Sequence, residues 1–195
     1  KQVLFLLPEI ALTTQLIQRL SIYFGDQIGV YHSKFNQNER VEIWNKVLAN
    51  DPQQYRLIIG ARSAVFLPYQ DLGLIIVDEE HESSFKQYDP SPRYNARDAA
   101  LILANLHKGK TLLGSATPSM ETFYNAKKGK YALVSLSERY KGLQLPEVLV
   151  ADLKKERQMK QMQSHFSALL MDEIVLALSR KEQVILFQNR RGYTP

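Results

Sequence analysis

Short apolar runs alternate with stretches of helical periodicity along the first two thirds of the chain. The runs predict strands, and stretches in which apolar side chains recur every three or four residues predict amphipathic helices. We expect strands at residues 3–7, 27–31, 55–59, 72–77, 111–114 and 131–136, and helices at residues 8–20, 36–48, 95–106 and 119–126. Residues 72–77 show no polar alternation, which is typical of a strand covered on both faces. This order of elements predicts an α/β fold with a parallel sheet and helices on both faces.

Two local signals predict where helices begin. Asn36 is followed three residues later by Glu39, which is the pattern of a capping box. Pro8 follows the first expected strand and suits the first turn of a helix, where a missing N–H group costs little.

The chain changes character after residue 136. Residues 137–163 are basic, contain Pro146 and show weak periodicity, with a candidate strand at 147–153. A helix at 166–178 and a strand at 184–187 are expected to follow. We therefore expect a first lobe at residues 1–140, a basic linker or crossover at 141–163, and the start of a second lobe at 164–195.

The composition limits the class of protein. Charged residues make up 23% of the chain and apolar residues 45%, which is typical of a globular protein rather than a disordered one. The absence of cysteine removes thiolate zinc sites and thiol nucleophiles from this chain and favours a cytoplasmic location. Neither a signal peptide nor an apolar run of roughly 18 residues is present, so we expect no membrane association. The chain begins without a methionine, and we expect it to be a piece of a longer protein.

Positive charge is concentrated in the second half of the chain. Residues 1–98 carry ten Lys and Arg against twelve Asp and Glu, whereas residues 99–195 carry fifteen against eight. This distribution is compatible with a nucleic-acid partner, but charge alone favours the alternative of a plain solvated surface.

Asp78 and Glu79 directly follow the apolar run 72–77. In an open parallel sheet the carboxyl ends of the strands line the ligand crevice. A carboxylate at Asp78 can hold Mg²⁺ against the phosphates of a nucleotide, and Glu79 can orient or deprotonate the attacking water. Glu80 and His81 extend this polar edge. The alternative is an acidic loop without a function.

Three further strand ends carry polar groups. Gly114–Pro118 contains small hydroxyl residues, and residues 60–66 place Arg62 and Ser63 where they can hold phosphate oxygens. Residues 8–13 begin a helix whose N-terminus favours anions. Each signal is weak alone, but together they predict a phosphate-handling site at one edge of the sheet.

A loop punctuated by Pro90 and Pro92 interleaves aromatic rings with cations. These side chains are Phe85, Lys86, Tyr88, Arg93, Tyr94 and Arg97. Stacking of a base on an aromatic ring is worth roughly 1–3 kcal/mol, so the loop is a candidate surface for single-stranded DNA. The alternative is that the rings are packed beneath the domain.

No phosphate-binding loop of the form G-x-x-x-x-G-K-[ST] occurs in the chain. The nearest match is Gly109-Lys110-Thr111, but Ala104 stands at the position of the first glycine. A helix also precedes this segment and a strand follows it, which is the reverse of the required order. We therefore interpret it as a helix end followed by a strand start.

These segments resemble, in order and over nearly the whole chain, the motifs of the bacterial primosomal replication-restart helicases of helicase superfamily 2. Residues 7–13 (Leu-Pro-Glu-Ile-Ala-Leu-Thr) are similar to motif Ia, and residues 60–66 (Gly-Ala-Arg-Ser-Ala-Val-Phe) to motif Ib. Residues 78–81 (Asp-Glu-Glu-His) are similar to motif II, residues 114–118 (Gly-Ser-Ala-Thr-Pro) to motif III, and residues 186–193 (Leu-Phe-Gln-Asn-Arg-Arg-Gly-Tyr) to motif IV.

The resemblance implies a RecA-like sheet of the P-loop NTPase kind that lacks its first strand and phosphate loop, followed by the start of a second such lobe. It implies that Asp78 holds Mg²⁺ through the nucleotide and that Glu79 activates water. Residues implied to couple hydrolysis to DNA binding are Glu80, His81, Ser115, Ala116 and Thr117. Residues implied or expected to bind DNA are Pro8, Glu9, Arg62, Ser63, Phe85, Lys86, Tyr88, Arg93, Tyr94, Arg97, Asn189, Arg190 and Arg191.

The resemblance further implies an ATP- and Mg²⁺-dependent 3′→5′ helicase that unwinds forked DNA and restarts stalled replication. Its implied partners are single-stranded and forked DNA, primosome proteins and single-strand-binding protein, and a zinc-binding cysteine module is implied outside this chain. One alternative is a DNA- or protein-binding module without ATPase activity. Another is a different superfamily 2 translocase, against which the Pro-Glu-Ile-Ala-Leu-Thr and Asn-Arg-Arg-Gly-Tyr segments argue. Without a phosphate loop, the chain alone is expected to be inactive.

Overall fold

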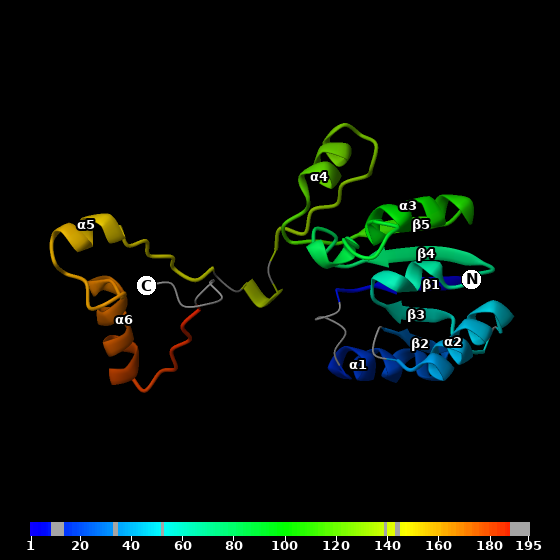
Figure 1. Cartoon of the computed structure of the whole chain (residues 1–195), viewed down its shortest axis with the longest axis horizontal. Coiled ribbons are helices and arrows are strands. Elements are labelled where there is room, and N and C mark those ends of the chain that lie inside the picture. Colours follow the sequence, from blue (N-terminus) through cyan, green and yellow to red (C-terminus); the bar gives the residue numbers. More distant parts are fainter. Residues whose placement is uncertain (9–13, 33–34, 52, 139, 143–144, 188–195) are drawn as a thin grey trace. The chain divides into compact units, whose positions relative to one another are not determined.

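The computed structural model describes residues 1–8, 14–32, 35–51, 53–138, 140–142 and 145–187. The chain divides into two compact units, Lys1–Val134 and Ser135–Pro195, which are called unit 1 and unit 2 below. Figure 1 labels the helices and strands of both units.

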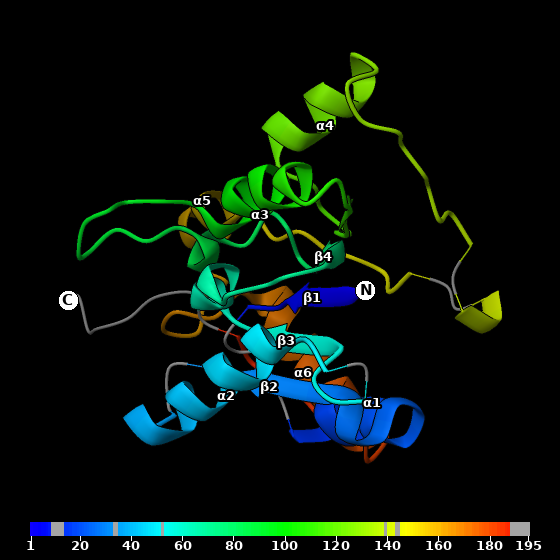
Figure 2. The ribbon, with the colours of Figure 1, turned by 90° about the vertical axis from the view of Figure 1, so that its right-hand side faces the viewer.

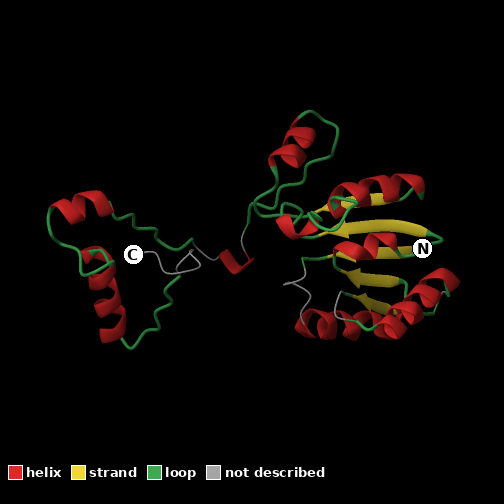
Figure 3. Cartoon of the chain, in the orientation of Figure 1, coloured by secondary structure: helices red, strands yellow, loops and turns green. Residues whose placement is uncertain are grey.

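Unit 1 is built on a five-stranded sheet, drawn in yellow in Figure 3. The strands are β1 (Gln2–Leu6), β2 (Ile28–Tyr31), β3 (Leu57–Gly60), β4 (Leu72–Val77) and β5 (Lys110–Leu113), in the order β2-β3-β1-β4-β5. All four pairings are parallel, so the carboxyl ends of the strands lie along one edge. The expected α/β fold with a parallel sheet is confirmed, and each of these strands lies within two residues of its expected bounds.

Helices cover both faces of this sheet. They are α1 (Thr14–Phe24), α2 (Gln37–Ala49) and α3 (Ala96–Leu106). Helix α4 (Met120–Lys127) follows β5 and has no buried residue. The 3₁₀ turns of this unit are η2 (Gly25–Gln27), η3 (Arg62–Phe66) and η4 (Ser83–Phe85). Alternate strand residues point to opposite faces. Leu4 and Ile58 accordingly pack in the same core as α2, α3 and η3, whereas Phe5 and Ile59 pack with α1. Figure 2 shows α1 and α2 on opposite sides of the β2 end of the sheet.

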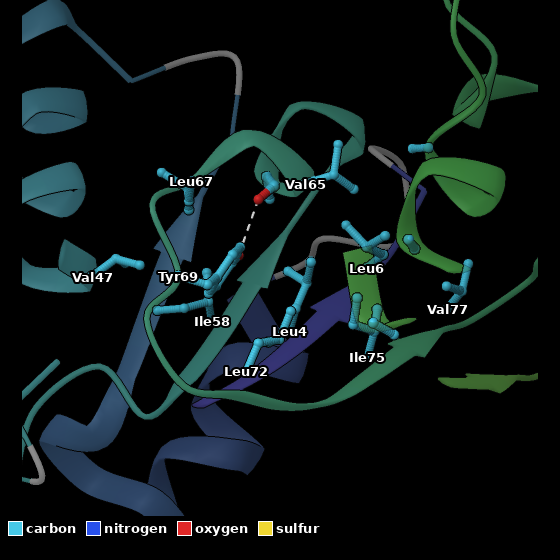
Figure 4. Packing of buried hydrophobic residues seen from close by; sticks show 14 of the residues in the cluster. Leu4, Leu6, Val47, Ile58, Val65, Leu67, Tyr69, Leu72, Ile75 and Val77 are labelled. Atoms are coloured by element: carbon cyan, nitrogen blue, oxygen red, sulfur yellow. Dashed lines mark hydrogen bonds between the residues drawn. The ribbon is translucent and has the colours of Figure 1, made fainter. Parts of the chain in front are cut away.

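The larger core contains the buried phenol of Tyr69. Figure 4 shows apolar side chains of β1, β3 and β4 packed around Tyr69, whose hydroxyl donates a hydrogen bond of 3.0 Å to the carbonyl oxygen of Ala64. Burial raises the pKa of the Tyr69 hydroxyl well above its ordinary value. The bond joins the segment before β4 to η3 and so supports the strand that leads into the acidic residues.

The helix that begins after Asn36 starts as the sequence predicts. The Asn36 side chain accepts a hydrogen bond from the N–H of Glu39 at 3.0 Å, and the Glu39 carboxylate accepts one from the N–H of Asn36 at 2.8 Å. Both halves of the capping box are present, so this prediction is confirmed. The expected helix start at Pro8 falls on residues 9–13, which lie outside the described residues, and α1 is described from Thr14.

The strands expected at 131–136 and 184–187, and the candidate strand at 147–153, are wrong. None of these segments carries a strand in the described structure. An apolar run becomes a strand only when neighbouring strands supply hydrogen-bond partners and packing surface. Ile185, for example, is 92% exposed and has no such surface.

Unit 2, taken by itself, contains the short turn η5 (Tyr140–Gly142) and the helices α5 (Leu153–Gln158) and α6 (Ala168–Ser179). The helix expected at 166–178 is confirmed as α6, with Ser167 as its N-cap. Glu156 of α5 accepts a hydrogen bond of 2.7 Å from the N–H of Ala168, which ties the two helices together. The division into a first lobe, a linker and a second lobe stays a prediction. In the part of the chain that the structure describes, no helix has the length and apolar character to cross a bilayer.

Candidate active site

Four strand ends of unit 1 are tied together at one edge of the sheet. The N–H of Leu7 donates to the carbonyl oxygen of Gly60 at 3.0 Å, that of Asp78 to Leu6 at 3.0 Å, and that of Gly114 to Val77 at 2.8 Å. These bonds continue the parallel ladders beyond β1, β4 and β5. The segments that begin at Leu7, Gly60, Asp78 and Gly114 therefore lie side by side, as their positions after parallel strands predict.

The chain turns sharply out of β4 at residues 78–82. We call Asp78–His81 the acidic turn. Glu79 has φ 48°, in the left-handed region that residues other than glycine rarely adopt. The N–H of Glu79 donates to the Asp78 carboxylate at 3.0 Å, and the N–H of Glu82 donates to the Glu79 carbonyl at 2.8 Å. If the strand continued, the neighbouring side chains of Asp78 and Glu79 would point to opposite faces of the sheet. Because the chain turns here, the two carboxylates are not bound by that alternation.

A cleft of about 480 Å³ opens beside the acidic turn. The predicted site residues in its wall are Pro8, Glu79, His81, Ala116 and Thr117. Motif-like segments that are up to 109 residues apart in sequence thus contribute to one cavity. Its walls combine a half-exposed carboxylate at Glu79 with the loop that follows β5. This loop contains Ser115 and Thr117 and is called the hydroxyl loop.

The arrangement fits a metal ion shared with a ligand rather than one held by protein alone. No group of three or more His, Cys, Asp or Glu side chains able to hold a metal occurs among the described residues. One oxygen of Asp78, Oδ1, accepts the N–H of Glu79, and Oδ2 accepts no hydrogen bond from the described part of the chain. Mg²⁺ in nucleotide sites is typically bound through one or two carboxylates, with phosphates and water completing the octahedron. Asp78 matches that requirement.

His81 connects the acidic turn to the loop after β5. Its Nδ1 lies 2.7 Å from the Ser115 hydroxyl and 3.6 Å from a Glu79 carboxylate oxygen. Its Nε2 lies 3.4 Å from the Thr117 hydroxyl, while the Ser115 hydroxyl accepts the Thr117 N–H at 3.0 Å. The structure therefore joins the predicted coupling residues His81, Ser115 and Thr117 in one hydrogen-bonded group.

Glu80 points away from the cleft and is 2% exposed. Its carboxylate accepts hydrogen bonds from the Ser119 N–H at 2.6 Å, the Ser119 hydroxyl at 3.0 Å and the Thr122 hydroxyl at 2.9 Å. It also pairs with Arg97 at 3.0 Å. Burial alone would raise the pKa of the Glu80 carboxyl, but these hydrogen bonds outweigh burial and lower the pKa below its ordinary value.

Arg62 fixes the base of the aromatic loop. Its Nη1 donates to the carbonyl oxygens of Lys86 at 2.9 Å and Ser84 at 3.5 Å. Farther along, the N–H of Gln87 donates to the Tyr94 carbonyl at 2.8 Å, and the Gln87 side chain donates to Pro90 and Pro92. Hydrogen bonds from Arg62 and from the backbone and side chain of Gln87 therefore brace this loop.

The side chains predicted to bind DNA fall into three groups in the structure. Tyr88 is 66% exposed and Arg93 is exposed, so both are available to a ligand. Phe85 is 1% exposed and belongs to the larger core, and Tyr94 is half-buried with its ring 4.8 Å from that of Phe66. Arg97 is held in the ion pair with Glu80. Phe85 and Arg97 offer no surface for a base or a phosphate, so we leave them out of the DNA interface proposed below.

The other residues predicted to bind DNA are bonded or half-buried within unit 1, or lie outside the described residues. Ser63 lies half-buried in η3, and the Lys86 ammonium donates to the Arg93 carbonyl at 3.2 Å. Glu9, Asn189, Arg190 and Arg191 lie outside the described residues. Their assignment stays a prediction.

Sequence reasoning missed Ser119 and Thr122. Ser119 is the N-cap of α4, and its side chain accepts the Thr122 N–H at 3.3 Å. A serine at an expected helix start signals an anion-friendly N-terminus. Nothing local, however, indicates that the anion is Glu80, which lies 39 residues earlier.

Comparison with known proteins agrees with this geometry. A family model described as DEAD/DEAH box helicase matches residues 1–126. Over 195 residues the chain is 44% identical to the replication restart protein PriA of Rickettsia felis and 42% identical to that of Haemophilus influenzae. It is 41% identical over 194 residues to the Bacillus subtilis protein of the same name.

These alignments cover all of the present chain, but only 29% of the Rickettsia felis protein, 26% of the Haemophilus influenzae protein and 24% of the Bacillus subtilis protein. The chain therefore spans about a quarter of the length of these relatives. The resemblance to replication-restart helicases inferred from the motifs is confirmed.

Proposed function

The chain belongs to the DEAD/DEAH box helicase family, and from this premise we propose that it forms part of the ATP-driven motor of a replication-restart DNA helicase. The observation that carries the proposal is the acidic turn after β4, hydrogen-bonded to the hydroxyl loop after β5 beside an open cleft. Because the chain spans about a quarter of its curated relatives, the activity is proposed for a longer polypeptide that contains it.

In the proposed mechanism Asp78 and Glu79 have different tasks. Asp78 would hold Mg²⁺ bound to ATP. The ion would neutralise negative charge on the β- and γ-phosphates. Glu79 lies in the cleft wall with a half-exposed carboxylate and would orient the attacking water and accept its proton. The left-handed backbone at Glu79 supports this division of tasks because it directs the chain out of the strand between the two carboxylates.

His81, Ser115 and Thr117 are proposed to couple hydrolysis to DNA binding. The His81 ring bridges the acidic turn and the loop after β5 through hydrogen bonds of 2.7 and 3.4 Å. A shift of that loop would move the ring and its Glu79 neighbour. Ala116, in the same loop, contributes to the cleft wall beside Thr117.

We assign single-stranded DNA to a surface made by Tyr88 and Arg93. Both side chains are exposed on a loop whose base is fixed by Arg62. A ring and a guanidinium on one braced loop suit base stacking and phosphate contact. Translocation from 3′ to 5′, forked DNA as substrate, and association with primosome and single-strand-binding proteins belong to the same proposal, supported by the similarity to replication restart proteins.

The test is ATP hydrolysis by a full-length protein that carries this segment, measured with and without single-stranded DNA. We expect DNA-stimulated turnover that Asp78→Asn abolishes and that Asp26→Asn, the same change in an exposed turn before β2, leaves intact. Equal turnover in the Asp78→Asn variant would contradict the metal assignment.

The 195-residue chain alone provides a second test, because it contains no phosphate loop. We expect no DNA-stimulated turnover from it. Turnover that disappears in the Asp78→Asn variant of this chain would show that the phosphate-binding elements have been misidentified. If the chain alone binds single-stranded DNA without hydrolysing ATP, it behaves as a DNA-binding module.

A further inference from the structure

Glu80 makes contacts that neither metal binding nor water activation requires. Its carboxylate is 2% exposed and directed away from the cleft, so it touches neither a nucleotide there nor DNA. We propose that Glu80 is a positioning residue that anchors helix α4 to the acidic turn. The proposal rests on the function assigned above to that turn.

The first support is the way in which α4 is attached. None of the residues of α4 is buried, so apolar packing does not hold the helix against the sheet. Its start is instead bound to Glu80 by the Ser119 N–H, the Ser119 hydroxyl and the Thr122 hydroxyl, at 2.6 to 3.0 Å. A carboxylate at a helix N-terminus satisfies free N–H groups and interacts favourably with the helix dipole. Glu80 therefore supplies the main described attachment of α4.

The second support is Arg97, which neutralises the buried carboxylate. Arg97 lies in the first turn of α3 with a side chain that is 12% exposed. Its Nη1 donates to Glu80 at 3.0 Å and to the Ser119 hydroxyl at 2.8 Å, and its Nε donates to Asp98 at 2.9 Å. The start of α3, the acidic turn and the start of α4 are thus joined through one carboxylate.

The third support is that Glu80 is fixed at both ends. Its backbone N–H donates to the Gly114 carbonyl at 3.0 Å, while its side chain is held by α4 and α3. The peptide between Glu79 and Glu80 is therefore held from the Glu80 side, next to the left-handed backbone of Glu79. Release of the Glu80 side chain would leave this peptide with the bond to the Gly114 carbonyl but without the attachment to α3 and α4, and would so loosen the position of the Glu79 carboxylate.

The test uses a full-length protein that carries this segment and compares kcat with KM for ATP at saturating single-stranded DNA. We expect Glu80→Gln to lower kcat by about tenfold or more, the factor attributable to charge-assisted hydrogen bonds and to misplacement of a reacting group. KM for ATP should change by less than about twofold, because Glu80 makes no nucleotide contact. Glu42→Gln is the matched control, since it makes the same chemical change on the exposed side of α2.

A second pair of variants guards against simple failure to fold. Thr122→Val removes the hydroxyl that donates to Glu80 while retaining the side-chain shape, and Thr122→Ser retains the hydroxyl. We expect Thr122→Val to lower kcat without changing KM for ATP, and Thr122→Ser to have a kcat close to that of the wild type. A purely structural role predicts equal kcat per folded molecule in all variants, and that result would overturn the proposal.

Hydrogen exchange of the 195-residue chain separates this proposal from the proposed function. In Glu80→Gln the amides of α4 and of residues 79–82 should lose protection, whereas those of β4 should retain it. If the wild-type full-length protein had no ATPase activity, the proposed function would be contradicted. The exchange result would still test whether Glu80 anchors α4. Unchanged protection of α4 would show that Glu80 does not anchor the helix.

Discussion

Replacement of Phe85 distinguishes a core residue from a DNA contact. In the structure the ring is 1% exposed and packs in the larger core of unit 1. Truncation of a buried phenylalanine to alanine costs about 3–5 kcal/mol, because transfer energy is lost and a cavity is left. Globular proteins have total stabilities of about 5–15 kcal/mol, so Phe85→Ala should remove roughly a fifth or more of this margin. A chain of this size should then melt roughly 6–20 °C lower.

The assay is denaturant unfolding of the 195-residue chain, followed by circular dichroism, together with fluorescence anisotropy of a labelled single strand at two salt concentrations. Tyr88→Ala is the matched control in the same loop, because this ring is 66% exposed. We expect Phe85→Ala to lower the unfolding midpoint, and Tyr88→Ala to weaken DNA binding at an unchanged midpoint. An unchanged midpoint for Phe85→Ala with weakened DNA binding would refute the core assignment.

Three smaller perturbations test other parts of the structure. Asn36→Ala removes the capping box of α2 and should destabilise the chain by about 0.5–2 kcal/mol in thermal unfolding, with no change if the cap is not formed. Tyr69→Phe should cost about 1 kcal/mol at neutral pH. The raised pKa of folded Tyr69 means that its stabilisation is present below the unfolded pKa of about 10 and declines as pH rises above it, so the variant should lose less stability than wild type on alkaline titration. Arg62→Met should expose the loop after η4 to limited proteolysis, because the donor to Lys86 and Ser84 is lost, and an unchanged cleavage rate would show that the loop is fixed by other contacts.

The sequence predicts best those features that depend on neighbouring residues or on one strong period. The capping box at Asn36 and Glu39 is complete within four residues, and its geometry follows directly from the motif. The run at 72–77 has the apolar character of a strand buried on both faces, and β4 has the bounds expected from it. Parallel pairing then requires the polar strand ends to share one edge.

Features that depend on distant partners are not available from the sequence alone. The run at 184–187 is as apolar as that at 72–77, but a strand also requires neighbours, which the described part of unit 2 does not supply. Phe85 and Tyr88 belong to the same aromatic loop, and only the tertiary packing makes one a core residue and the other a surface residue. Arg97 was assigned to DNA because it is a cation near aromatic rings, whereas its partner Glu80 lies 17 residues earlier.

In the proposed mechanism Glu79 activates water while Asp78 holds the metal and its nucleotide. Glu79→Gln removes the proton acceptor and retains nearly the same shape, in a side chain that is half-exposed and therefore contributes little to folding. The most direct measurement is single-turnover ATP hydrolysis by a full-length protein carrying this segment, with single-stranded DNA present and ATP binding measured in parallel. We predict that Glu79→Gln binds ATP as wild type does and hydrolyses it at least about a hundredfold more slowly. Hydrolysis at the wild-type rate would contradict the assignment.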